Sequence, residues 1–215
     1  MNSNQENNRY QRQLILKELG EVGQEKLVKA KVLVIGAGGL GCPALQYLTA
    51  AGIGTIGIVD FDVIELSNLQ RQPLYAVEDI GKLKVDVSET KLRAINPEIN
   101  INVFRTQLTN QNALVIINQF DLVLDCTDNF LTRYIINDTC ILLNKAFIYG
   151  AVLRFEGQCA VFNLKDIKTG TQTNYRDLFP TADDAALSCN EAGILGVLPG
   201  IIGTIQASAT FNLTQ

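Results

Sequence analysis

The chain has 215 residues, 47% of them hydrophobic and 19% charged, and its formal net charge is −4. This length and composition suit a single well-buried α/β domain, and without a basic excess nothing indicates nucleic-acid binding. Histidine is absent from the sequence, which excludes histidine-based acid–base catalysis and histidine-ligated metals.

In chain order the sequence predicts helix 9–19, helix 22–30, strand 32–35, helix 44–51, strand 55–59, helix 82–95, strand 99–104, helix 109–119, strand 122–124, helix 129–144, strand 147–153, strand 158–164 and helix 192–215. The helices follow from apolar residues at helical spacing, and the strands from short apolar runs between glycines or polar residues. Before the first helix, the polar residues 1–8 are expected to form a disordered tail. The last helix is uncharged, but its glycines and its lack of cationic flanks favour a buried or interface helix over a membrane segment.

The alternation of buried strands and helices predicts an α/β fold, a Rossmann-like and mainly parallel sheet with helices on both faces. Arg154–Gly157 predicts a hairpin turn, so antiparallel strands extend the sheet. We expect one domain over residues 9–215, with residues 9–30 as an N-terminal helical arm. The polar and irregular stretch of about 165–189 is typical of a mobile functional loop.

A glycine pattern, Gly36, Gly38 and Gly41, matches G-x-G-x-x-G between the first predicted strand and the helix after it. Glycines allow the tight turn and the close approach of a phosphate to the backbone, and the helix amino end supplies free N–H groups. Asp60 ends the next strand and can accept hydrogen bonds from ribose hydroxyls. The pattern therefore predicts a nucleotide site, the alternative being glycines that serve tight packing alone. An NAD-dependent oxidoreductase would show the same features.

Two cations follow the second strand at positions where the triphosphate of a bound ATP would extend, Arg71 and Lys84. Asn68 and Gln72 are neutral donors in the same region. A dinucleotide has no γ-phosphate, so this run favours ATP over NAD. An exposed arginine or lysine taken alone usually only makes the surface soluble. The inference therefore depends on these four residues occurring together.

Several motifs, in the same order, resemble the ThiF/MoeB/HesA family of bacterial relatives of ubiquitin-activating enzymes. This family includes molybdopterin-synthase adenylyltransferase and its thiamine-pathway counterpart. The resemblance spans roughly residues 9–207. Its motifs are Arg9-Tyr10-x-Arg12-Gln13, the 36–41 loop, Asp60-Phe61-Asp62, Leu66 to Gln72, Asp125-Cys126-Thr127-Asp128-Asn129 and Glu191-Ala192-Gly193.

The resemblance implies an adenylyltransferase that acts on a ubiquitin-fold sulfur-carrier protein ending in Gly-Gly. The carrier carboxylate would attack the α-phosphate of Mg-ATP and release pyrophosphate. That carboxylate is already an anion, so no general base is needed, which fits a chain without histidine. The chain ends before the last part of the family fold, so the first alternative function is an ATP-binding dimeric scaffold without turnover. An NAD-dependent oxidoreductase is the less favoured alternative.

The same resemblance implies roles for individual residues. Gly39 would lie under the phosphates and Asp60 would hold the ribose. Asp128 would hold Mg²⁺, with Asn129 beside it, although from the residues alone Asp128 is equally a helix cap. Arg12 would reach into the site of a partner subunit, which implies a homodimer. The remaining nucleotide contacts are expected from Asp62, Ser67, Asn68, Leu69, Gln70, Arg71, Gln72 and Lys84.

The five cysteines are Cys42, Cys126, Cys140, Cys159 and Cys189. An odd number of cysteines, without a hydrophobic targeting segment, indicates reduced thiols and a cytoplasmic protein. Cys189 matches a cysteine that some family members link covalently to the carrier, and a non-essential loop cysteine is the alternative.

Many members of this family hold a structural zinc ion with two CxxC pairs. Where the first pair would lie, this chain has Asn174 and Asp177, and it ends before the second. Tetrahedral zinc needs four good ligands. We therefore expect ATP and Mg²⁺ as cofactors, and no zinc, no nucleic acid and no membrane.

Overall fold

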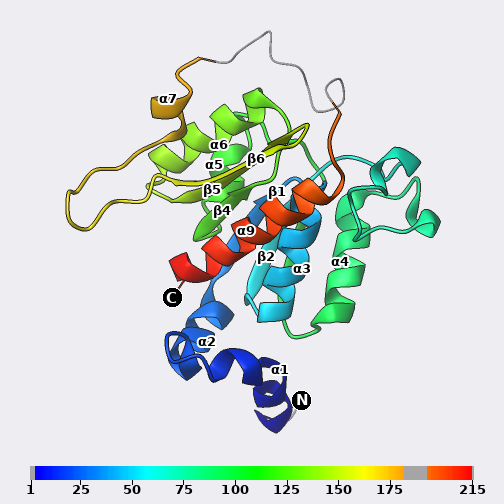
Figure 1. Ribbon diagram of the computed structural model, residues 1–215, viewed down its shortest axis with the longest axis vertical. Helices are drawn as coiled ribbons and strands as arrows, with labels where there is room; N and C mark the ends of the chain where they lie inside the picture. The colour runs from blue at the N-terminus through cyan, green and yellow to red at the C-terminus, as the bar shows by residue number, and fades with distance from the viewer. Residues whose placement is uncertain (1–2, 182–192, 215) are drawn as a thin grey trace.

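A computed structural model describes residues 3–181 and 193–214 (Figure 1). Its centre is a six-stranded sheet of order β3-β2-β1-β4-β5-β6. The strands are β1 (Lys31–Ile35), β2 (Thr55–Val59), β3 (Asn100–Phe104), β4 (Leu122–Asp125), β5 (Phe147–Leu153) and β6 (Glu156–Phe162). The first five strands are parallel, and β6 pairs antiparallel with β5. The predicted Rossmann-like fold with its antiparallel extension is confirmed.

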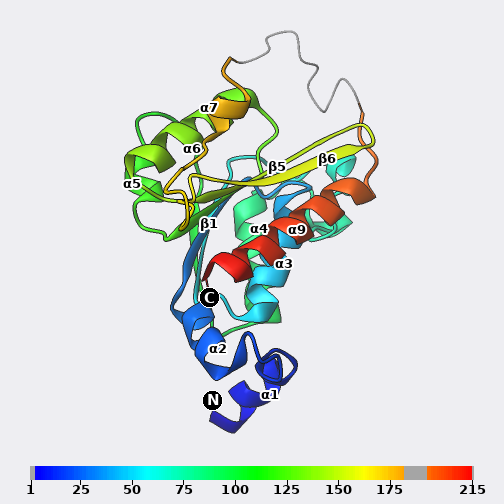
Figure 2. The ribbon, with the colours of Figure 1, turned by 60° about the vertical axis from the view of Figure 1, so that its left-hand side comes forward.

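Helices cover both faces of the sheet (Figures 1 and 2). On one face α3, α4 and α9 pack over a core that includes Leu45, Leu92 and Ile202. On the other face α5 and α6 pack over a core that includes Ile117 and Ile136. The helices are α1 (Ser3–Leu14), α2 (Gly20–Lys29), α3 (Gly41–Ala51), α4 (Lys84–Ile95), α5 (Ala113–Ile117), α6 (Phe130–Leu142), α7 (Tyr175–Leu178) and α9 (Val197–Thr214).

The N-terminal helices extend from the end of the sheet where the strands begin (Figure 1). Helix α1 begins at Ser3, whereas the sequence predicted a disordered tail up to residue 8. This stretch contains neither glycine nor proline, so it lacks the residues that most strongly break a helix. The arm packs onto the domain through hydrogen bonds from Gln13 and Gln24 to the carbonyl of Ala51.

Helices α4 and α5 begin later in the chain than their periodicity suggested. Helix α4 begins at Lys84 rather than at residue 82, because Leu83 is engaged in a β-bridge with Val63. Helix α5 begins at Ala113 rather than at residue 109. There the Asn112 side chain accepts a hydrogen bond from the Thr109 amide and holds a turn before the helix.

 The C-terminal helix α9 lies across one face of the sheet (Figure 2), and its buried Gln206 donates hydrogen bonds to the carbonyls of Asp125 and Ile148. These bonds connect α9 to the last residue of β4 and to the first part of β5. The buried or interface helix expected here is present as a helix that begins at Val197, and residue 192, where it was predicted to begin, lies outside the described residues. None of the described helices combines the length and apolar character that crossing a bilayer requires.

The loop predicted over about 165–189 is described only as far as residue 181. It contains a turn closed by a bridge between Lys165 and Gln172, followed by the short helix α7. The Tyr175 side chain of α7 is buried against Tyr134 and Phe162, so this part of the segment is anchored on the domain.

Candidate nucleotide-binding site

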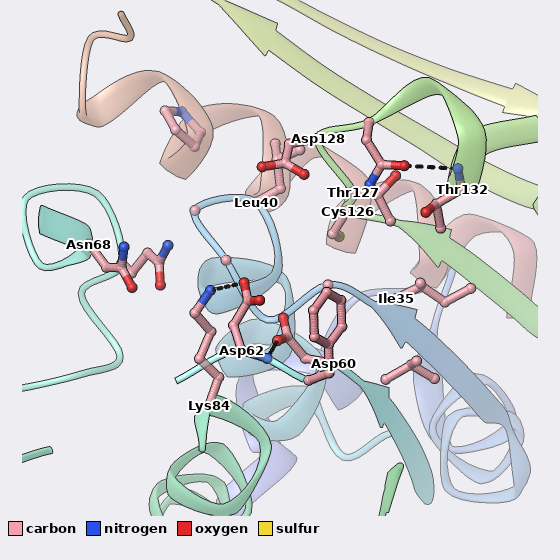
Figure 3. A pocket seen from close by; sticks show the side chains of 18 of the residues that line it. Ile35, Leu40, Asp60, Asp62, Asn68, Lys84, Cys126, Thr127, Asp128 and Thr132 are labelled. Carbon is pink, nitrogen blue, oxygen red and sulfur yellow. Dashed lines mark hydrogen bonds and ion pairs between the residues drawn. The ribbon is translucent and has the colours of Figure 1, made fainter. Parts of the chain in front are cut away.

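A pocket of about 640 Å³ opens at the carboxyl ends of the parallel strands (Figure 3). It lies where β1 meets β2 on one side and β4 on the other, the position at which the strand order reverses. Open α/β sheets bind ligands at this switch point, because the loops after the two neighbouring strands diverge there. The lining includes the glycine loop and residues that follow β2, β3 and β4.

The glycine loop leaves β1 through a backbone conformation that other residues rarely adopt. Gly36 has a φ of 97°, and a Cβ atom there would lie 2.6 Å from the carbonyl oxygen of Cys126. A Cβ atom on Gly41 would lie only 1.9 Å from the carbonyl oxygen of Gly36. Gly36 therefore permits the turn, while Gly41 lets helix α3 begin directly against it.

Asp60, at the end of β2, holds the glycine loop in place. Its carboxylate accepts hydrogen bonds from the amide of Ala37 at 2.7 Å and from the amide of Asp62 at 2.8 Å. Burial raises the pKa of Asp60 above its ordinary value, against the opposing effect of Lys84. Each carboxylate oxygen can accept more than one hydrogen bond, so acceptor capacity remains for a ligand hydroxyl in the pocket.

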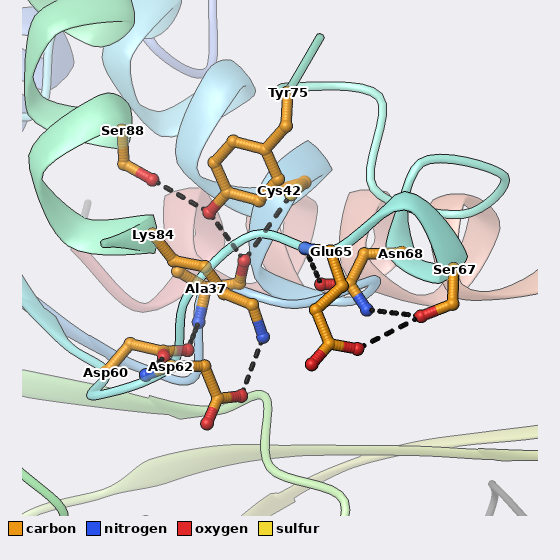
Figure 4. Close-up of polar contacts among 10 residues, drawn as sticks. All are labelled: Ala37, Cys42, Asp60, Asp62, Glu65, Ser67, Asn68, Tyr75, Lys84 and Ser88. Carbon is orange, nitrogen blue, oxygen red and sulfur yellow. Dashed lines mark hydrogen bonds and ion pairs between the residues drawn. The ribbon is translucent and has the colours of Figure 1, made fainter. Parts of the chain in front are cut away.

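A second contact, from Tyr75, holds the same loop (Figure 4). The buried Tyr75 hydroxyl donates to the carbonyl of Ala37 at 2.7 Å and lies 3.0 Å from the Ser88 hydroxyl. Ala37 is therefore bound through its N–H by Asp60 and through its C=O by Tyr75. Both polar groups of Ala37 are therefore held by side chains from outside the loop.

The cations expected near a triphosphate lie in this pocket. Lys84 is 6% exposed, and its Nζ is 2.7 Å from the Asp62 carboxylate, as Figures 3 and 4 show. Arg71 donates to the carbonyl of Ser67 at 3.0 Å. Asn68 is buried and accepts a hydrogen bond from the Glu65 amide. The Lys84 and Arg71 side chains thus both line the pocket, and each is held there by an oxygen acceptor.

Asp128 lies after β4 and projects toward the pocket near Leu40 (Figure 3). The cap of helix α6 is the neighbouring residue, since Asn129 Oδ1 accepts the Thr132 amide at 2.9 Å. Asp128 is exposed and makes no hydrogen bond among the described residues. The capping alternative for Asp128 is therefore wrong, and its carboxylate remains available to a ligand.

An exposed carboxylate beside a pocket that could hold phosphates suits Mg²⁺, which binds through one or two carboxylates, phosphate oxygens and water. Asp128 meets this description, and Asp62 offers a second carboxylate with a half-exposed side chain. The residues present therefore fit a nucleotide-bound magnesium ion.

The pocket contains most of the predicted site residues. They are Gly36, Gly38, Gly39, Asp60, Asp62, Ser67, Asn68, Arg71, Gln72, Lys84, Asp128 and Asn129. Gly41 does not line it and serves packing instead. Leu69 packs against the core, and Gln70 lies against Gly196, so neither lines the pocket. Their sequence neighbours Asn68 and Arg71 do line it.

Two predicted residues lie elsewhere. Arg12 is exposed on α1, near the end of the sheet where the strands begin, whereas the pocket is at the other end (Figure 1). Cys189 lies outside the described residues. Among the described cysteines, Cys42, Cys126 and Cys140 are buried, and burial raises the pKa of the Cys42 thiol to about 12.

Sequence reasoning missed several residues of the lining. Arg133 comes from the first turn of α6, and Pro199 comes from the first turn of α9. A further group, Thr106, Gln107 and Leu108, follows β3. The sequence did carry a signal for Arg133, since the amino end of a helix that follows a parallel strand faces the same crevice as the strand end.

The two positions where relatives would hold zinc are engaged with each other. The Asp177 carboxylate accepts hydrogen bonds from the backbone and the side-chain amides of Asn174, at 2.9 and 2.8 Å. The Asn174 side chain in turn accepts the Arg176 amide. No group of three or more candidate metal-ligating side chains occurs among the described residues. The expectation that this chain holds no zinc stays a prediction, which elemental analysis of the purified protein would check.

Known proteins are similar in sequence to this chain over nearly its whole length. The model of the ThiF family matches residues 10–215. A sulfur carrier protein adenylyltransferase from Thermus thermophilus is 46% identical over 211 residues, which cover 97% of this chain and 78% of that protein. A probable molybdopterin-synthase adenylyltransferase from Porphyra purpurea is 48% identical over 212 residues, which cover 97% of this chain and 54% of that protein.

Among solved structures, E. coli MccB with MccA-N7isoASN has a TM-score of 0.83 at 24% sequence identity, over 97% of this chain and 64% of that chain. This likeness concerns the fold alone. The family match, together with relatives that share nearly half of their aligned residues with this chain, establishes the relationship. The chain belongs to the ThiF family.

Proposed function

We propose that this protein binds Mg-ATP and adenylates the C-terminal glycine carboxylate of a ubiquitin-fold sulfur-carrier protein. The observation that carries the proposal is a single pocket that joins the Asp60-anchored glycine loop with Arg71, Lys84 and Asp128. Relatives named as adenylyltransferases support the reaction type.

The reaction needs charge control rather than proton transfer. A carrier carboxylate oxygen forms a bond to the α-phosphorus while the bond from that phosphorus to the bridging oxygen breaks, giving an acyl-adenylate and pyrophosphate. Two anions must approach each other, and negative charge grows on the departing pyrophosphate. Cations aimed at those oxygens lower the barrier, because they stabilise the charge where it develops.

The residues of this chain divide that work. Asp60 would hold the ribose, and the amides of the glycine loop would face the phosphates. Lys84 and Arg71 would neutralise the polyphosphate, with Lys84 exchanging its partner Asp62 for a phosphate oxygen or sharing it. Asp128 and Asp62 would hold Mg²⁺, which when bound supplies further positive charge to the phosphate oxygens.

We further propose that the active unit is a homodimer in which Arg12 enters the site of the partner subunit. Within one chain Arg12 lies at the end of the sheet away from the pocket. A role in catalysis therefore requires a second copy. By analogy with phosphoryl transfer, an arginine supplied by a partner can contribute about 10³- to 10⁵-fold in rate.

ATP–pyrophosphate exchange tests the adenylation. Protein, Mg-ATP, labelled pyrophosphate and a carrier ending in Gly-Gly should move label into ATP, and a carrier without its last two glycines should not. Replacing Lys84 with methionine should abolish exchange while the variant remains folded. ATP binding without exchange for every sulfur carrier of the source organism would contradict adenylation and support a scaffold. Preferential binding of NAD would instead support an oxidoreductase.

A further inference from the structure

Arg133 is a buried cation whose role the proposed reaction leaves open. It lies in the first turn of α6, lines the pocket and is 7% exposed. Its guanidinium lies over the rings of Phe130 and Tyr149, at 5.4 and 5.3 Å from their centroids. These stacking contacts fix the plane of the guanidinium.

One hydrogen bond connects Arg133 to the loop after β4. Its Nη2 donates to the carbonyl oxygen of Thr127 at 3.1 Å. That carbonyl belongs to the peptide group whose nitrogen is the amide of Asp128. Arg133 therefore holds the peptide that carries the proposed magnesium ligand.

Asp125 binds the other side of Thr127. Its Oδ1 accepts hydrogen bonds from the Thr127 amide at 3.0 Å and from the Thr127 hydroxyl at 2.7 Å. Asp125 is fully buried, and Arg133 opposes the rise in its pKa that burial causes. The two buried charges thus compensate each other while both bind the same residue.

The loop from Asp125 to Asn129 is consequently held at both ends. Asp125 and Arg133 fix Thr127, and Asn129 is fixed by its capping bond to Thr132. Asp128 lies between these anchors with its carboxylate exposed at the pocket. A carboxylate held in this way needs little ordering when it binds a metal ion.

We propose that Arg133 is a positioning residue that holds the Thr127–Asp128 peptide and thereby sets how strongly Mg²⁺ increases the affinity of the pocket for ATP. This inference rests on the proposed role of Asp128. Arg133 acts through Asp128, so the Mg²⁺-dependent part of ATP binding depends on it, whereas ATP binding without Mg²⁺ does not.

Calorimetric titration of the full chain with ATP, in excess Mg²⁺ and again in EDTA, tests the proposal. Partners that orient a metal ligand typically contribute about 10- to 100-fold in metal affinity. The Mg²⁺-dependent gain is the ratio of the ATP affinity in Mg²⁺ to that in EDTA. We expect Arg133→Met to lower this gain at least about tenfold and to leave the ATP affinity in EDTA unchanged. Arg133→Lys keeps the charge and can still reach a carbonyl, so it should restore part of the gain.

Arg176→Met is the matched control. Arg176 also stacks over a tyrosine, Tyr134, and pairs with an aspartate, Asp138, but it does not line the pocket. This variant should keep the full Mg²⁺-dependent gain. If Arg133→Met does not fold, the double variant Asp125→Asn/Arg133→Met removes both buried charges and keeps an acceptor for Thr127.

Coupling to Asp128 provides a second readout. Asp128→Asn should lose the Mg²⁺-dependent gain, and adding Arg133→Met to it should have little further effect, because both changes act on one interaction.

Additive losses would overturn the proposal, as would an equal loss of ATP affinity in EDTA, which would assign Arg133 a direct contact with the nucleotide. Binding of ATP by the unaltered protein without any Mg²⁺-dependent gain would overturn it as well. Failure of carrier adenylation alone would contradict only the proposed function.

Discussion

Asp60 combines two tasks in one side chain. Its carboxylate is bound by the amides of Ala37 and Asp62, and it faces the pocket in which the ribose is proposed to lie. The first task shapes the glycine loop, and the second is the proposed contact with the ribose. A change at Asp60 should therefore affect the proposed ATP binding through both.

We predict that Asp60→Asn weakens ATP binding. An asparagine has one acceptor oxygen, so either the Ala37 or the Asp62 amide loses its partner. Hydrogen bonds to charged groups contribute about 1.5–3 kcal/mol, and we therefore expect the Kd for ATP to rise by about tenfold or more. Calorimetric titration measures this change. Asp86→Asn, on the surface of α4 and paired with Arg105, is the matched control and should bind normally. An unchanged Kd in Asp60→Asn would contradict the assigned role.

At the scale of elements, helix α9 packs directly on the backbone of the glycine loop. A Cβ atom on Gly203 would lie 2.1 Å from the carbonyl oxygen of Leu40, and Pro199 lies beside Gly39. The close approach requires a residue without a side chain. Gly200, one turn earlier in the same helix, has no atom within 4 Å of a Cβ position.

This contrast predicts opposite effects of two alanine substitutions. Gly203→Ala should push α9 away from the loop, lower the stability by about 1–3 kcal/mol, as overpacking does, and weaken ATP binding. Gly200→Ala should be neutral or stabilising by up to about 1 kcal/mol, because alanine favours a helix. Urea unfolding and ATP titration compare the two variants. Equal stability and affinity of the two would show that α9 does not constrain the loop.

Helix α7 is anchored to α6 by a partly exposed ion pair. Arg176 donates two hydrogen bonds to Asp138, at 2.8 and 2.7 Å, and lies over the ring of Tyr134. The Arg176 guanidinium holds the pKa of Asp138 below its ordinary value. A carboxylate whose pKa is lower in the folded state adds stability above its unfolded pKa and loses it as the pH falls through the folded value.

We therefore predict that Asp138→Asn lowers the free energy of unfolding at pH 7 but not in acid. The pair is partly exposed, so the difference should be at most about 1 kcal/mol. It should diminish below the ordinary aspartate pKa of about 3.9 and vanish once the pH is below the lowered folded value. Urea unfolding of both proteins across this pH range measures the difference. A difference that grows as the pH falls would contradict the assigned cause.

At the scale of the whole molecule, the position of Arg12 makes the proposed dimer testable. Arg12 and the pocket lie at opposite ends of the sheet within one chain. If Arg12 serves the site of the partner, one intact site can form from two different defective chains.

We predict that Arg12→Ala and Lys84→Met, each inactive alone, recover exchange activity when they are co-expressed with different tags and purified as a mixed dimer. The chain with Arg12→Ala keeps Lys84 and receives Arg12 from the other chain. Each variant purified as its own dimer is the control. A mixed dimer without activity would place Arg12 in the site of its own chain, or in no site.

The sequence predicted best those features that depend on neighbouring residues. Thr55–Val59 and Phe147–Leu153 are strands with the predicted bounds, because short, mainly apolar runs suit a buried strand. Helix ends were harder to predict. Leu83 joins a bridge to Val63, a contact that no local pattern reveals.

Within the site, sequence alone determined the glycine loop, the acid that ends β2 and the cations that follow, since each occupies a characteristic place beside a strand or a turn. Only the tertiary structure decided which of several residues adjacent in the chain face the pocket. It made Asn129 the cap and left the Asp128 carboxylate exposed, turned Gln70 toward Gly196, and brought Arg133 to the pocket. The physical reason is that side-chain direction depends on packing between elements distant in sequence, which a linear motif does not contain.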